Sequence, residues 1–152
     1  MLFHASIPAD DPERVARVIA SLWRGRAYPF PVYPGAYVAC AGDDRGTLID
    51  VVPRTLEHVP APNCFSVRTN AAASEYSAAH LAIGTRIGKD EILALAASEG
   101  WFAQYSDRGG LFGVVELWIE NRFLLELLPE EEQQRYTEAL GPAQLDASLG
   151  NL

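Results

Sequence analysis

The chain has 152 residues, of which 49% are apolar, and its formal net charge at pH 7 is -8. It is long enough for one ordinary core or two small modules, and its 12 basic residues argue against a nucleic-acid surface, because Lys and Arg make most phosphate contacts. No stretch approaches the roughly 20 apolar residues of a membrane span, and no basic segment precedes a long apolar run as in a secretory signal.

The two cysteines, Cys40 and Cys64, do not form a CxxC pair, and two cysteines do not make the disulfide framework of a small secreted domain. We expect both to be reduced thiols without a chemical role. Together with the missing span and signal, this predicts a cytoplasmic protein with no membrane partner.

The chain begins with a predicted strand and helix. In residues 2–8 the side chains of His4 and Ser6 share one face, and apolar side chains share the other. A helix follows, since Asp10 or Asp11 can cap it and apolar residues recur at helical spacing. The helix covers the apolar face of the strand, so His4 is expected on the opposite face of the sheet.

Three further strands complete the first half. The proline-rich segment 26–35 suits an edge strand or an extended loop, and its aromatic side chains either cover that edge or line a pocket. Segments 36–41 and 47–52 alternate as two strands of a hairpin joined by a glycine-containing turn. Asp50 lies within the second of these strands.

The second half repeats this order. After an irregular stretch, residues 77–85 predict a strand with His80, and a helix follows with Asp90 and Glu91 in its first turn. Segment 101–106 predicts another strand. Residues 130–140 predict a polar helix, and the tail beyond it is expected to be loosely held.

The apolar hairpin 111–129 closes the second half, with Glu120-Asn121-Arg122 at its turn. Glu126 lies among six apolar residues and needs solvent or a positive partner, because burying an unpaired carboxylate is costly. Glu116 lies in the preceding strand. A two-residue turn would place it on the face opposite Glu126, and a three-residue turn on the same face, where it could act as a general base.

An internal repeat relates the two halves. The sequence GTLIDVVP around Asp50 has the pattern of RFLLELLP around Glu126, 76 residues later. His4 lies 46 residues before Asp50, and His80 lies 46 residues before Glu126. Each half therefore reads as a strand with a histidine, a helix, two strands and a strand with an acid.

These patterns predict an α+β fold made of two β-α-β-β-β modules that pair into a curved mixed sheet with a central cleft. We assign residues 1–56 to the first module, 57–77 to a linker and 78–129 to the second module. Residues 130–152 form a C-terminal helix and tail. Pairing would bring two imidazoles and two carboxylates together, a set that suits a divalent zinc, nickel, iron or manganese ion.

This arrangement resembles the vicinal oxygen chelate superfamily, which includes glyoxalase I, bleomycin-resistance proteins, fosfomycin-resistance transferases and extradiol dioxygenases. The resemblance covers residues 2–56 and 78–129. It implies a metal held from the first and last strands of each module, and a small substrate bound to it through adjacent oxygens. The implied ligands are His4, Asp50, His80 and Glu126.

One departure concerns Asp50, because the family more often has glutamate there and aspartate is shorter by about 1.5 Å. If Asp50 does not reach the metal, His4, His80 and Glu126 remain as a three-ligand set.

The resemblance implies a lyase or isomerase reaction of glyoxalase type, in which the catalytic group Glu126 exchanges protons with the substrate. A dioxygenase fits less well, because its additional histidine could only be His58 in the linker. The alternative is a metal-free protein that sequesters a small molecule, as in bleomycin resistance. Association into a homodimer is compatible with either function.

Overall fold

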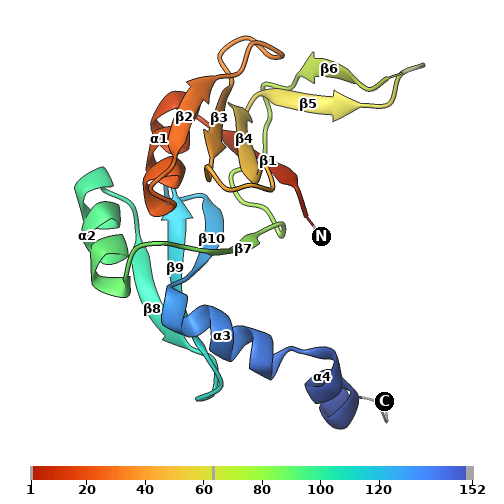
Figure 1. The fold of residues 1–152 in the computed structure, drawn as a ribbon. Helices are drawn as coiled ribbons and strands as arrows, with labels where there is room; N and C mark the ends of the chain where they lie inside the picture. The colour runs from red at the N-terminus through yellow and green to blue at the C-terminus, as the bar shows by residue number, and fades with distance from the viewer. Residues whose placement is uncertain (1, 63, 150–152) are drawn as a thin grey trace. The chain divides into compact units, whose positions relative to one another are not determined.

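The computed structural model describes residues 2–62 and 64–149, which fall into two compact units, Met1–Ala78 and Ala79–Leu152. The first unit contains a four-stranded sheet with the strand order β1-β4-β3-β2 (Figure 1). Strands β1 and β4 are parallel, and the other neighbours are antiparallel. The elements of this module are β1 (His4–Ala9), α1 (Pro12–Leu22), β2 (Arg26–Pro29), β3 (Tyr37–Cys40) and β4 (Leu48–Pro53).

The second unit repeats this topology with the strand order β7-β10-β9-β8. Its first and last strands are again parallel, and its other pairs are antiparallel. The α+β class and the duplicated β-α-β-β-β module are therefore confirmed. The elements are β7 (Leu81–Gly84), α2 (Lys89–Glu99), β8 (Ala103–Asp107), β9 (Gly113–Ile119) and β10 (Phe123–Leu128).

Two segments have more regular structure than the sequence indicated. The stretch assigned to a linker, 57–77, contains most of a two-stranded hairpin formed by β5 (Leu56–Val59) and β6 (Ser66–Thr69). The tail expected after α3 (Glu130–Ala139) forms a further helix, α4 (Pro142–Leu149). Within the described residues, no helix is long and apolar enough to cross a bilayer.

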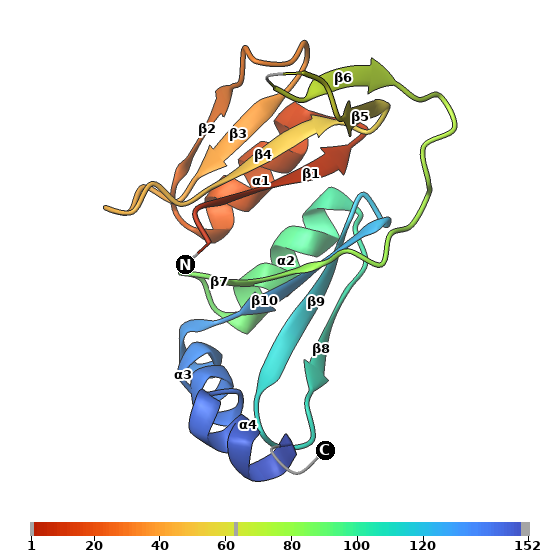
Figure 2. The ribbon, with the colours of Figure 1, turned by 90° about the vertical axis from the view of Figure 1, so that its right-hand side faces the viewer.

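Each sheet has one face packed on a helix, as Figure 2 shows for α1 and α2. The cap of α1 is Asp11, whose side chain accepts a hydrogen bond from the backbone N–H of Arg14, as the sequence predicted. Strand residues that alternate with His4 and Asp50 face α1, and they form the core of the first module. Its fully buried side chains include Ile7, Val15, Ile19, Leu22 and Val51.

The opposite face of each sheet is covered differently in the two modules. In the first, Val52 packs with Tyr33 and Ala36 beneath side chains of the β5–β6 hairpin. In the second module, Tyr136 of α3 packs on Leu128 and Val114. The polar helix α3 is therefore held by an apolar contact, and this contact lies two residues beyond Glu126 on the same face of β10.

Both module helices end in the same backbone motif. Gly25 N–H donates to Ala20 C=O at 2.8 Å, and Trp101 N–H donates to Ala96 C=O at 2.9 Å. The residue before each donor has a positive φ, which is 71° at Gly100 but 52° at Arg24. Glycine suits this left-handed position because it has no Cβ, whereas other residues are strained there.

Replacing Arg24 with glycine should therefore stabilise the protein by about 1 kcal/mol, the usual cost of a non-glycine residue in this conformation. Urea unfolding followed by circular dichroism measures the change. The reciprocal variant, Gly100→Ala, should lose a similar amount. Equal or lower stability of Arg24→Gly would show that the motif is not strained.

Candidate metal centre

The two modules position their histidine and acid in the same register. In the first, Ser6 lies opposite Asp50 in the parallel pair β1–β4, and His4 lies two residues before Ser6 on the same face. In the second, Ala82 lies opposite Glu126, and His80 lies two residues before Ala82. His80 immediately precedes β7 and is exposed, as is His4. Each module thus presents its predicted pair of ligands, one imidazole and one carboxylate, on the face away from its helix.

Asp50 is buried with 7% of its surface exposed, although it is ionisable. Its Oδ2 accepts a hydrogen bond from Ser6 Oγ at 3.3 Å. Its Oδ1 is buried and has no hydrogen-bond partner among the described residues. A buried carboxylate oxygen is costly without a donor or a cation, so Asp50 has capacity for one further positive partner.

Glu126 has a partner for only one of its two oxygens among the described residues. Its Oε1 accepts a hydrogen bond from Arg108 Nη2 at 2.5 Å, so of the two predicted environments, solvent or a positive partner, this oxygen has the positive partner. Its Oε2 lies 4.0 Å from Nε2 of His80, beyond hydrogen-bond distance. Oε2 of Glu126 and the imidazole of His80 therefore face each other without a direct bond.

Glu116 lies directly opposite Glu126 in the antiparallel pair β9–β10. The connecting turn has three residues, with a positive φ at Glu120 and Asn121, so the same-face alternative is correct. The same Arg108 Nη2 also donates to Glu116 Oε1 at 2.9 Å. Hydrogen bonds from Gln104 and Arg108 lower the pKa of Glu116, which keeps it ionised and makes it a weak base at neutral pH.

Arg108 is the residue that sequence reasoning missed. It follows Gln104 and Ser106 at a spacing of two, and Gln104 donates to Glu116 at 2.8 Å while Arg108 donates to Ser106 at 2.9 Å. This alternation of polar residues in and after β8 was the available signal. Such a stripe indicates a polar face of the sheet, but it does not indicate which acid the arginine will contact.

Other candidate groups lie apart from this chemistry. Burial and the nearby charge of Asp50 raise the pKa of the Cys40 thiol, which stays protonated at neutral pH and is a poor nucleophile or ligand. His58 lies in β5, where its ring packs on Phe65 at 4.7 Å and on Tyr33 at 5.5 Å between centroids. This packing gives His58 a structural role.

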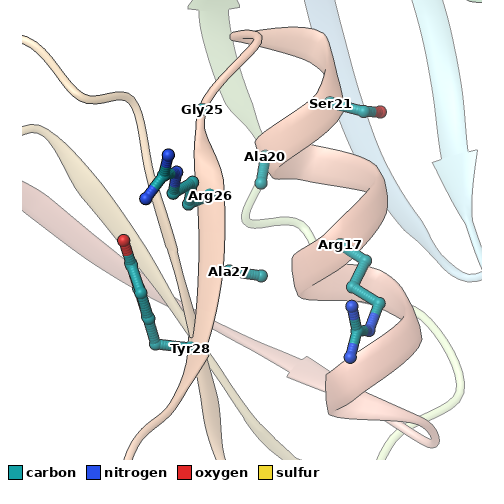
Figure 3. Close-up of a pocket in the computed structure, with 7 residues that line it drawn as sticks. All are labelled: Arg17, Ala20, Ser21, Gly25, Arg26, Ala27 and Tyr28. Carbon is teal, nitrogen blue, oxygen red and sulfur yellow. The ribbon is translucent and has the colours of Figure 1, made fainter.

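A pocket of about 360 Å³ lies between α1 and β2 in the first module (Figure 3). It is lined by Arg17, Ala20 and Ser21 of the helix and by residues 25–28. Ala27 points toward the helix, whereas Arg26 and Tyr28 point away from it (Figure 3). The lining contains no histidine or acid, so this pocket does not contribute to the predicted metal site.

The described ranges, 2–62 and 64–149, contain no group of three or more His, Cys, Asp or Glu side chains arranged to hold a metal ion. Each module by itself offers one histidine and one acid of the predicted set. Protein metal sites usually have three or four protein ligands, so the predicted centre requires residues from both modules.

No protein-family model matches the chain, and no curated protein matches it by sequence. Solved structures match it in fold. The fosfomycin resistance protein FosX from Listeria monocytogenes is 12% identical with a TM-score of 0.57, and the match covers 89% of this chain and 97% of that one. Glyoxalase I from Leishmania major is 17% identical with a TM-score of 0.52, covering 100% and 99%.

Lactoylglutathione lyase from Agrobacterium tumefaciens is 11% identical with a TM-score of 0.54, and the match covers 86% of this chain and 94% of that one. All three neighbours belong to one superfamily. At these identities the likeness concerns the fold, which is the one that the duplicated pattern of strands and helices predicted.

Proposed function

We propose that this chain, which has the vicinal oxygen chelate fold, binds one divalent metal ion through His4, Asp50, His80 and Glu126. The predicted pairing of the two modules around a central cleft is part of this proposal. The metal would act as a Lewis acid toward a small substrate that binds it through adjacent oxygens. A lyase or isomerase reaction of glyoxalase type, with proton exchange at Glu126, is the chemistry we favour.

The observation that carries the proposal is the unpartnered buried Oδ1 of Asp50. A structural carboxylate at 7% exposure would be expected to accept hydrogen bonds at both oxygens, whereas a ligand keeps one oxygen for the cation. This supports Asp50 as a fourth ligand over the three-ligand set.

The fold neighbours give further support. A variant of the Listeria FosX was solved in complex with Mn(II) and 1S,2S-dihydroxypropylphosphonic acid, and its fold matches this chain with a TM-score of 0.56. That ligand is a small molecule with neighbouring oxygens. We extend this class of ligand to the present chain as part of the proposal, and leave the metal as zinc, nickel, iron or manganese.

Elemental analysis of protein purified without chelator tests the proposal. We expect about one equivalent of metal in the wild type and its loss in both His80→Ala and Glu126→Ala. Adding the metal identified by elemental analysis to wild-type protein from which the metal has been removed should raise its Tm, because a ligand that binds the folded state stabilises it. Metal-free protein whose Tm does not respond to zinc, nickel, manganese or ferrous iron would contradict the proposal.

Asp50→Asn separates the role of Asp50 as a ligand from a structural role. Without metal this variant should be more stable than the wild type, because it removes a buried charge that lacks a full set of partners. Its metal affinity should nevertheless be lower. Asp44→Asn, at an exposed turn position, is the matched control and should change neither property.

The second candidate function is metal-free binding of a small molecule, as in bleomycin resistance. The ion pair between Arg108 and Glu126 favours it, because the guanidinium already neutralises one of the predicted ligands. Under this alternative the Glu126→Ala variant would contain as little metal as the wild type. The elemental analysis above therefore distinguishes the two functions.

A further inference from the structure

The side chains around Glu126 form a connected arrangement of charges that the metal proposal does not use. Arg108 Nη2 contacts Glu126 Oε1 at 2.5 Å and Glu116 Oε1 at 2.9 Å, so one guanidinium nitrogen bridges two carboxylates. Gln104 holds the other oxygen of Glu116 at 2.8 Å. We call Gln104, Arg108 and Glu116 the Arg108 bridge.

Partial burial and hydrogen bonds restrict the side chains of the Arg108 bridge to one arrangement. The side chains of Glu116 and Glu126 are 15% and 17% exposed, and that of Arg108 is 35% exposed. Two carboxylates directly opposite each other in a sheet repel, and the guanidinium between them offsets that repulsion. Ser106 Oγ accepts a further hydrogen bond from Arg108 Nη1 at 2.9 Å, which fixes the orientation of the guanidinium plane.

The Arg108 bridge determines which oxygen of Glu126 remains available to bind a metal ion. Oε1 is occupied by Arg108, and Oε2 is turned toward His80 at 4.0 Å. We propose that the Arg108 bridge is a positioning device that reserves Oε2 of Glu126 as the single metal-binding oxygen on the side of His80. This inference rests on the proposed metal binding, and it assigns positioning roles to Arg108 and Glu116.

The first module has a different arrangement at the corresponding place. In each sheet, four residues lie side by side across the four strands at the position of the acid. In the first module they are Ser6, Asp50, Val38 and Tyr28. In the second module they are Ala82, Glu126, Glu116 and Gln104. Asp50 is oriented by the Ser6 hydroxyl alone among these. Within residues 2–62 and 64–149, each acid thus has one oxygen held by a donor and one oxygen without a hydrogen bond, and the donor differs between the modules.

In Arg108→Met, the loss of a positive charge and the loss of positioning would change the metal affinity in opposite directions. Removing a cation makes the surroundings more negative, which by itself would strengthen metal binding. The double variant Arg108→Met/Glu116→Gln removes one charge of each sign and so keeps the net charge of the cluster. We therefore use the double variant to test positioning at constant charge.

The experiment measures the Kd for Mn(II) from the electron paramagnetic resonance signal of the free ion. We expect the double variant to bind about 10-fold to 100-fold more weakly than the wild type, the range found when groups that orient a metal ligand are removed. Arg108→Lys, which keeps a cation near Glu126, should bind more tightly than the double variant. Arg17→Met, which removes an exposed ion pair with Glu13, should bind as the wild type does.

Three results would overturn the inference. Equal or tighter Mn(II) binding by the folded double variant would show that Glu126 needs no positioning. If the double variant fails to fold, Arg108→Lys decides alone, and wild-type affinity in it would show that a cation near Glu126 suffices without the bridging geometry. If the wild type binds no Mn(II), the same comparison is made with zinc, nickel and ferrous iron, and absence of binding to all four metals would contradict the proposed function itself, together with this inference.

Discussion

Replacing Gly25 with alanine should destabilise the first module by about 3 kcal/mol or more, one of the largest effects expected for a single methyl group. A Cβ at this position would lie 2.0 Å from the carbonyl oxygen of Cys40 and 3.1 Å from its carbonyl carbon. Both are backbone atoms of β3, so no side chain can rotate away. Accommodating the methyl group requires β3 to move relative to the end of α1.

Urea unfolding followed by circular dichroism measures this loss, and hydrogen exchange shows whether it is confined to amides of the first module. Gly88→Ala is the control, because a Cβ there would meet no atom within 4 Å. Its cost should stay below about 1 kcal/mol, since it changes only the cap residue of α2. A loss in Gly25→Ala as small as in this control would show that β3 shifts freely.

The sequence predicted the fold because its two halves repeat both spacing and alternation. The interval from histidine to acid is conserved between the halves, and the parallel pairs β1–β4 and β7–β10 have the same register. Side chains alternate between the two faces of a strand, so this register places His4 and Asp50 on the same face of their sheet. It places His80 and Glu126 on the same face in the second module. A capping aspartate and apolar spacing located α1, and acidic residues in the first turn located α2.

The repeat could not predict the partner of Glu126, because the hairpins of the two modules differ in length. The connection from β3 to β4 spans residues 41–47, whereas that from β9 to β10 spans only 120–122. Val38 lies opposite Asp50 and Glu116 lies opposite Glu126, so the constant offset between the halves fails in this strand. Comparison of the halves therefore gave no indication of an acid beside Glu126.

Short elements escaped prediction for a different reason. Strands β5 and β6 have four residues each and flank a segment with Pro60 and Pro62, which reads as a loop. The hairpin forms because it covers Val52 and Tyr33, and that coverage depends on contacts distant in sequence. Local patterns do not contain this information.

Truncating Glu132 to alanine should destabilise the second module by about 2–4 kcal/mol, because a buried carboxylate with several donors is removed. Glu132 is 6% exposed, and its Oε2 accepts the buried N–H of Gly113 at 2.7 Å. Tyr105 Oη donates to its Oε1 at 3.2 Å, and Arg135 Nη1 lies 3.1 Å from both oxygens. The variant leaves the Gly113 N–H without this acceptor at the start of β9.

Glu131→Ala separates these buried bonds from the general effect of an acid in the first turn of a helix. Both residues lie in the first turn of α3, where a negative charge is worth about 0.3–1 kcal/mol through the helix dipole, but Glu131 is exposed. Thermal unfolding of the two variants should therefore differ by the contribution of the buried bonds. Hydrogen exchange should show α3 amides losing protection in Glu132→Ala alone, because Glu132 helps to hold the helix over Phe112 and Val114. Equal stability of the two variants would mean that apolar packing by Tyr136 is sufficient to hold α3.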